Sequence, residues 1–249
     1  MSVSQPADRV SEMEVAPGPL SPEEPPIAAA ISSALPPEWT MDEVVARLGG
    51  IPLGRIRAVP PPGMATEKDV LASESRYGRI CELVDGALVE KTMGYYESAL
   101  AMLIGRLLGE FVERHALGIV LGEAGTLKVL PDQVRIPDVS VICWERFPGR
   151  RLPAEPIPAV APDLAVEVLS EGNTPGEMRR KLEDYFRAGV RLVWYLDPKA
   201  RTMEVYTGPE RCVVVREDGA LDGGDVLPGF QLKLAELFAR VEGPGTGQS

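Results

Sequence analysis

The pattern of apolar and polar positions predicts a strand, a helix and a second strand between residues 162 and 198. Residues 164–169 are apolar except for Glu167, which is typical of a strand covered on both faces of a sheet. Apolar residues then recur at helical spacing in residues 178–186. Because residues 190–196 form another apolar run, we expect two parallel strands of one sheet, joined by the helix.

The predicted helix carries signals at both ends. Thr174 and Glu177 occupy the positions of a capping box, and Gly189 is expected to follow the last turn. Lys181 lies on the flank of the apolar stripe. Its ammonium could extend toward the sheet that holds Glu167, or its stem could merely cover the stripe, and helix geometry leaves both interpretations open.

Residues 79–91 predict a β-hairpin. Asp85 and Gly86 form a favoured two-residue turn between two short apolar strands. Glu82 lies inside the first of these strands. Alternation of apolar and polar positions by itself favours an outward-facing residue on an edge strand, so the pattern alone does not place Glu82 in a site.

The remaining pattern predicts elements on both sides of these motifs. Residues 1–38 are rich in proline and glutamate without a periodic apolar face, so we expect a disordered tail. Short helices begin at Thr40 and at Thr66, the second reaching about Ser73. We further expect a long helix at 95–115, strands at 118–121, 126–130 and 135–144, a polar hairpin at 202–216, an irregular segment at 221–227 and a terminal helix at 234–241.

A second acidic residue stands at the start of a buried run. Asp138 follows Pro137 and precedes the apolar residues 139–142, where it could cap the start of a strand. With Glu167 it gives two carboxylates in two buried strands. Antiparallel neighbours would hold them a few ångströms apart, and like charges at that distance need a cation between them. Asp163 is a rival acid, which we interpret as a residue at the start of a strand.

The composition of the chain excludes several classes of catalytic site. The single histidine, His115, excludes two-histidine catalysis and the usual histidine-assisted nucleophiles, and the three cysteines form no CxxC pair, so we expect buried thiols. The net charge of −11 argues against non-specific binding of nucleic acid. No signal pattern or membrane-spanning run is present, so we expect a cytoplasmic protein.

The residues that remain suit metal-assisted hydrolysis of a phosphodiester. Asp138 and Glu167 would hold Mg²⁺, a hard ion that prefers oxygen ligands, and Lys181 would contribute an ammonium from the adjoining helix. Such a set needs no histidine.

Four motifs carry a family resemblance. The segments CELVDGALVEK, RIPDVSVI, PDLAVEVLS and EMRRKLEDYFRAGVRLVWYLDP, in that order, resemble the Uma family of “putative restriction endonucleases”, in the PD-(D/E)xK nuclease superfamily. The resemblance implies an α/β fold, more closely an α+β mixed sheet: a restriction-endonuclease-like core with a central mixed β-sheet flanked by helices. The resemblance covers roughly residues 66–206. From it and the pattern along the rest of the chain, we expect a tail at 1–38, an N-terminal helix and linker strap at 39–65, the core at 66–241 and a frayed C-terminus at 242–249.

The resemblance assigns roles residue by residue. Asp138 matches the acid of the PD motif and Glu167 the acid of the (D/E)xK motif, and the backbone carbonyl of Val168 would be a further metal ligand. Glu82 matches the acid of the family's ELVDG segment. Two departures stand out: Leu169 takes the place of the superfamily's lysine, which Lys181 on the next helix would replace, and Glu97 lies where many relatives carry a histidine.

The function implied is a Mg²⁺-dependent DNA endonuclease, with Mn²⁺ as an alternative ion. In it, Asp138 and Glu167 bind metal, Lys181 positions water, and Glu82 completes the site. The alternative is a catalytically silent nuclease-fold module that binds DNA or protein. DNA is the expected substrate, no membrane partner is expected, and a homodimer is left open. A two-carboxylate glycosidase has little support, because aromatic residues make up only 6% of the chain.

Overall fold

The computed structural model describes residues 38–242 of the chain. The predicted N-terminal tail and the frayed C-terminus lie outside these residues except for their inner ends. In residues 38–242, no helix has both the length and the apolar character needed to cross a lipid bilayer.

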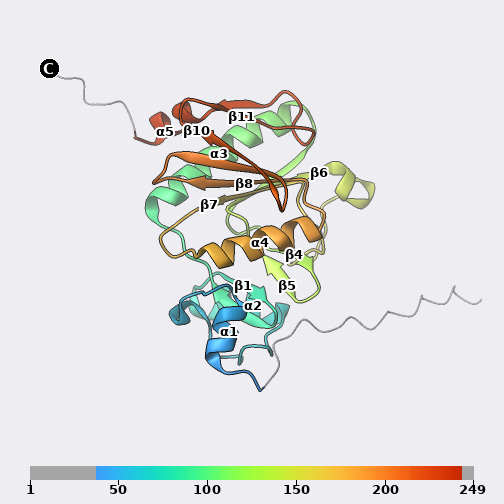
Figure 1. Cartoon of the computed structure of the whole chain (residues 1–249). Helices are drawn as coiled ribbons and strands as arrows, with labels where there is room; N and C mark the ends of the chain where they lie inside the picture. The colour runs from blue at the N-terminus through green and yellow to red at the C-terminus, as the bar shows by residue number, and fades with distance from the viewer. Residues whose placement is uncertain (1–37, 243–249) are drawn as a thin grey trace, which may run out of the picture. The chain divides into compact units, whose positions relative to one another are not determined.

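A mixed six-stranded sheet, here called the central sheet, forms the middle of the fold, with the strand order β10-β9-β8-β7-β6-β3 (Figure 1). Strands β7 and β8 are parallel, and the other neighbours are antiparallel, so the predicted mixed α/β fold class is confirmed. The strands are β3 (Gly118–Leu121), β6 (Val139–Cys143), β7 (Leu164–Val168), β8 (Leu192–Asp197), β9 (Thr202–Gly208) and β10 (Arg211–Arg216).

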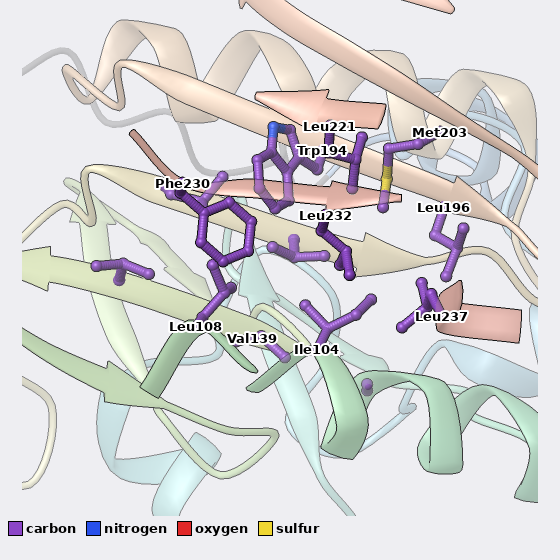
Figure 2. Close-up of a cluster of buried hydrophobic side chains, with 14 of the residues drawn as sticks. Ile104, Leu108, Val139, Trp194, Leu196, Met203, Leu221, Phe230, Leu232 and Leu237 are labelled. Atoms are coloured by element: carbon purple, nitrogen blue, oxygen red, sulfur yellow. The ribbon is translucent and has the colours of Figure 1, made fainter. Parts of the chain in front are cut away.

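One face of the central sheet carries the main hydrophobic core. Helix α3 (Tyr95–Arg114) and helix α5 (Leu234–Glu242) cover it, together with a small ribbon of β11 (Ala220–Asp222) and β12 (Gln231–Lys233). Figure 2 shows Trp194 of β8 among side chains from α3, α5 and this ribbon. Burying each such side chain contributes roughly 1.5–3 kcal/mol, so this face anchors the sheet and leaves the other face for the polar chemistry.

The opposite face carries helix α4 (Pro175–Arg187), the helix predicted from the sequence. Thr174 and Glu177 form the expected capping box, and Gly189 follows the helix with a φ of 87°. Met178, Leu182 and Tyr185 pack against the sheet, as the apolar spacing predicts. The crossover from β7 through α4 to β8 is therefore confirmed.

A second sheet of four strands, the hairpin sheet, covers the other side of α4 in Figure 1, with the order β2-β1-β5-β4. Asp85 and Gly86 have φ of 48° and 73°, which gives the predicted hairpin turn. The strands are β1 (Cys81–Val84), β2 (Ala87–Glu90), β4 (Leu127–Leu130) and β5 (Gln133–Arg135), and the helices beside them are α1 (Met41–Arg47), η1 (Leu53–Arg55) and α2 (Glu67–Tyr77). Two short turns, η2 (Trp144–Arg146) and η3 (Pro148–Arg150), follow β6.

Several local predictions were wrong. The single strand expected at 135–144 is two strands in different sheets, because Pro137 interrupts the run between β5 and β6. The irregular segment at 221–227 contains most of β11. Helix α2 continues to Tyr77 rather than about Ser73, and Cys212 is exposed although Cys81 and Cys143 are buried.

The segment before the hairpin joins the hairpin sheet to α4 through one buried arginine, Arg55. Arg55 donates to both carboxylate oxygens of Glu177 at 2.7 and 2.8 Å, and to the carbonyl oxygens of Gly172 and Glu90. Gly49 and Gly176 approach so closely that a Cβ on Gly176 would lie 2.5 Å from the Gly49 oxygen. The hairpin sheet is therefore fixed to the N-terminus of α4.

Asp163, at the start of β7, has the structural role expected of it. Its carboxylate accepts the Cys143 N–H at 2.7 Å and bonds from Arg146 and Arg191 at 3.0 Å each. Burial by itself would raise the pKa of Asp163, but the Cys143 amide and the Arg146 guanidinium outweigh this effect and lower it. The charged form of Asp163 therefore stabilises the junction between β6 and β7.

We predict that Asp163→Asn lowers the free energy of unfolding by about 1–3 kcal/mol at neutral pH. A lowered folded-state pKa gives a contribution that is complete above the unfolded-state pKa, about 3.9, and is lost as the pH falls through the folded-state pKa. Urea denaturation from neutral to acidic pH should show the gap between the two proteins closing at the acid end. Asp225→Asn, at an exposed position, is the control. A pH-independent gap would contradict the role of the charge.

Candidate active site

The structure brings Glu82, Asp138, Glu167 and Lys181 into one buried cluster. Glu82 lies on β1, Asp138 directly before β6, Glu167 on β7 and Lys181 on α4. Their side chains are 3–5% exposed. The cluster lies where α4 meets both sheets, so no single layer of the fold contains it.

Asp138 and Glu167 approach each other through the strand register. Strands β6 and β7 are antiparallel with Val139 opposite Val166, so the next pair in this register is Asp138 and Glu167. Residues that face each other in this way have Cβ atoms about 4.5–5.5 Å apart. Asp138 Oδ2 also accepts the Val168 N–H at 2.6 Å, which fixes the carboxylate against β7.

Lys181 joins the acids of the two sheets. Its Nζ lies 3.0 Å from Glu82 Oε1 and 3.1 Å from Glu167 Oε1. A lysine that only covers the apolar stripe would keep its ammonium in water, and the 4% exposure of this side chain excludes that alternative. Burial by itself would lower the pKa of Lys181, but the two carboxylates outweigh it and raise the pKa, so the amine stays protonated.

Glu82 faces inward, contrary to the edge position that alternation alone favours. Strand β1 lies between β2 and β5, so it has no free edge. Oε1 accepts the Ile136 N–H at 3.0 Å as well as contacting Lys181, and Oε2 accepts from Arg135 at 2.9 Å. Burial would raise the pKa of Glu82, but Lys181 and Arg135 lower it to about 2. Glu82 is therefore an ionised residue that holds Lys181 in place.

The pKa of Glu167 is raised, in contrast to that of Glu82. Its Oε1 accepts the Tyr185 hydroxyl at 2.5 Å and contacts Lys181, which leaves Oε2 without either partner. Burial raises the pKa of Glu167 to about 7; the Lys181 charge opposes this rise and the Asp138 charge adds to it. The two carboxylates at the start of β6 and in β7 therefore act on each other, as like charges in a shared space do.

Sequence reasoning missed three further charged members of this cluster. Arg135 bridges Glu82 and Asp184, at 2.9 and 2.5 Å. Lys91 Nζ lies 2.7 Å from Asp138 Oδ1. The available signal was a charged residue beside or within an apolar strand: Arg135 between Val134 and Ile136, and Lys91 after β2. We call the seven groups together the buried ion cluster: Glu82, Lys91, Arg135, Asp138, Glu167, Lys181 and Asp184.

A large cleft is lined by residues of α4, β8 and β9, and none of the seven members of the buried ion cluster lines it. Its volume is about 1230 Å³, and Leu169, Met178 and Leu182, close in sequence to cluster members, line part of it. Glu97 lies in this cleft and not against the cluster acids. Acidic lining residues outnumber basic ones: Glu97, Glu171, Glu183, Asp197, Glu204 and Glu210 against Arg179 and Lys199. A polyanion would not bind this cleft without added cations.

Asp138 and Glu167 are ligands of the type that a hard divalent cation prefers, but they are only two. No group of three or more histidine, cysteine, aspartate or glutamate side chains in residues 38–242 is placed to hold a metal. Mg²⁺ is commonly held by one or two carboxylates together with water and substrate phosphate. Asp138 Oδ1 is buried and accepts no hydrogen bond of good geometry from the described residues, but the Lys91 ammonium lies 2.7 Å from it, so this oxygen is in a position suited to a cation. Asp138 and Glu167 are therefore the residues that would hold such an ion.

Comparison with known proteins agrees with the fold. A family model described as “Uma2: Putative restriction endonuclease” matches residues 68–235. Among solved structures, the chain is similar to a “putative nuclease belonging to DUF820” from Anabaena variabilis ATCC 29413, at 21% sequence identity and a TM-score of 0.59. That likeness covers 66% of this chain and 92% of the other, and at this identity it shows the fold. No curated protein matches the chain.

We predict that Arg135→Met lowers the free energy of unfolding by about 3–5 kcal/mol, because it leaves Glu82 and Asp184 buried without their shared cation. Arg187→Met is the matched control: Arg187 also faces Asp184, at 3.8 Å, but its side chain is 72% exposed, so its loss should cost less than about 1 kcal/mol. Urea denaturation measures both. Equal costs for the two variants would show that burial does not decide the strength of the Asp184 contacts.

Proposed function

The chain belongs to the Uma2 family of “putative restriction endonucleases”, and from this premise we propose that it is a divalent-metal-dependent endonuclease that hydrolyses phosphodiester bonds in DNA. The observation that carries the proposal is the meeting of Asp138 and Glu167 in adjacent strands with the Lys181 ammonium 3.1 Å from Glu167. These are the two acids and the amine that the motifs pointed to, and they come from three different segments of the chain.

Each group in the proposed site has a separate role. Asp138 and Glu167 hold the cation, preferably Mg²⁺ and alternatively Mn²⁺, and the Val168 carbonyl is proposed as a third oxygen ligand. When bound, the ion polarises the scissile phosphate and increases the acidity of water. Lys181 remains protonated, so it orients water and stabilises developing negative charge rather than accepting a proton. Glu82 touches Lys181 and is a positioning residue.

The second candidate function, a catalytically silent module that binds DNA or protein, is favoured by one observation. Every acid of the proposed site already faces a basic side chain: Glu82 and Glu167 face Lys181, and Asp138 faces Lys91. A site with its charges satisfied internally offers less driving force for binding an ion. The acidic lining of the large cleft between α4, β8 and β9 also disfavours DNA as a ligand there.

We predict that the wild-type protein nicks supercoiled plasmid in the presence of Mg²⁺. Asp138→Asn, Glu167→Gln and Lys181→Met should each reduce the nicking rate by about 100-fold or more, the usual effect of removing a group that stabilises charge in a transition state. Gel electrophoresis of the plasmid measures the rate, and circular dichroism checks that each variant is folded.

Lys68→Met and Asp225→Asn are the controls: each removes a lysine or an aspartate charge at an exposed position outside the site, so nicking should be unchanged. Nicking that persists at the wild-type rate in folded Asp138→Asn and Lys181→Met proteins would refute the site. Binding of plasmid without cleavage, with Mg²⁺ and with Mn²⁺, would favour the silent module instead.

Glu82→Gln tests the positioning role. The amide keeps the side chain's shape but weakens its hold on the Lys181 ammonium, so kcat should fall by about tenfold or more while KM for plasmid stays close to the wild-type value. Steady-state nicking measures both constants. An increase in KM with unchanged kcat would mean that Glu82 acts in substrate binding and not through Lys181.

A further inference from the structure

We propose that the Lys91 ammonium fills the cation position beside Asp138, so that a divalent cation enters the site only when this ammonium is displaced. Lys91 would then be an internal competitor of the metal ion and would set the metal concentration at which the site is loaded. The inference rests on the proposed function, since it concerns the regulation of that same site.

The contacts of Lys91 are those of a bound cation. Its Nζ lies 2.7 Å from Asp138 Oδ1 and donates to the Ile136 carbonyl oxygen at 2.6 Å. The other oxygen of this aspartate, Oδ2, is already held by the Val168 N–H. Oδ1 accepts no hydrogen bond of good geometry from the described residues, so its contact with Lys91 is mainly an attraction between charges. The oxygen that a metal ion would need is thus the one that faces the ammonium.

The charge balance of the buried ion cluster favours exchange of one cation for another. The cluster has four acids and three bases, which leave one negative charge when all are ionised. Without Lys91 the balance is two negative charges, and a divalent cation neutralises two. Retaining Lys91 beside the ion would place two positive charges against the same oxygen, and repulsion at such a distance is strong in a poorly solvated site.

Lys91 is also placed so that it can leave. Its side chain is 7% exposed, against 2–5% for the other six members, so Lys91 is the least buried side chain of the cluster. It directly follows β2, in the irregular segment 91–94, and a lysine stem has several rotatable bonds. In that segment Thr92 contacts Ser170, just after β7, with 3.2 Å between their hydroxyl oxygens, so the two loops meet beside the site.

The backbone beneath Lys91 is fixed, which confines the change to the side chain. The Lys91 N–H donates to the Ile80 carbonyl oxygen at 2.9 Å, and Arg55 donates to the carbonyl oxygen of Glu90 at 2.9 Å. Displacing the ammonium therefore requires rotation of the lysine side chain and no change in the pairing of β1 with β2.

Mn²⁺ binding, measured from the electron paramagnetic resonance signal of free Mn²⁺, tests the proposal without using nuclease activity. We expect Lys91→Met to bind one Mn²⁺ at least about tenfold more tightly than the wild type, because a competing charge is gone. Lys91→Gln, which keeps a hydrogen-bond donor, should do the same and serves if the methionine variant does not fold. The gain should disappear when Asp138→Asn is added to either variant. Lys68→Met, which removes an exposed lysine, should bind Mn²⁺ like the wild type.

Two results would overturn the proposal. One is unchanged Mn²⁺ affinity in the folded Lys91 variants, or a gain that survives Asp138→Asn. The other is failure of both variants to fold even with excess Mn²⁺, since the ion then cannot take the place of the ammonium. Failure of the Lys91 proposal can be distinguished from failure of the proposed nuclease function. Mg²⁺-dependent nicking without a gain in Mn²⁺ affinity refutes only the role of Lys91, and a gain in affinity without any nicking refutes only the nuclease.

Discussion

The constraint on which this structure depends is the cost of burying charge between α4 and the two sheets. Isolated ions in a protein interior cost several kcal/mol each, and the cost is recovered only when each charge meets an opposite one with good geometry. The buried ion cluster meets this condition by alternating acids and bases: Asp184 to Arg135 to Glu82 to Lys181 to Glu167, with Asp138 paired to Lys91. Since these groups come from both sheets and from α4, the cluster is also what aligns those layers.

Helix α4 has two roles for the same reason. Its apolar stripe packs on the central sheet, while its other side faces the hairpin sheet through ion pairs. Arg55 holds Glu177 at the start of the helix, and Asp85, in the hairpin turn, accepts from Arg180 at 2.6 Å. These ion pairs fix the position of α4, and with it Lys181, relative to the hairpin sheet. The position of the amine thus depends on contacts outside the site, whereas its charge state depends on Glu167 and Glu82 within it.

Pairings that stabilise the fold also close the candidate site. A phosphodiester must reach Asp138 and Glu167, yet both carboxylates are almost fully buried and face ammonium groups. Catalysis would therefore require an exchange of partners within the cluster, in which Lys91 is the least buried side chain. A nuclease and a silent binding module differ, on this view, in how readily that exchange takes place, and the difference lies in electrostatics rather than in the fold.

The sequence by itself determined several local elements and directed attention to the charged residues of the candidate site. Apolar runs and capping residues predicted β7, α4 and β8, the Asp-Gly turn predicted the hairpin, and the scarcity of histidine directed attention to Asp138, Glu167 and Lys181. Tertiary structure alone decided that Glu82 faces inward and that Arg135 and Lys91 join the cluster. Apolar patterning reports which face of an element is buried, but whether a buried charge has a partner depends on residues far away in the chain. Glu82 and Arg135, for example, are 53 residues apart, and only the pairing of the strands brings them together.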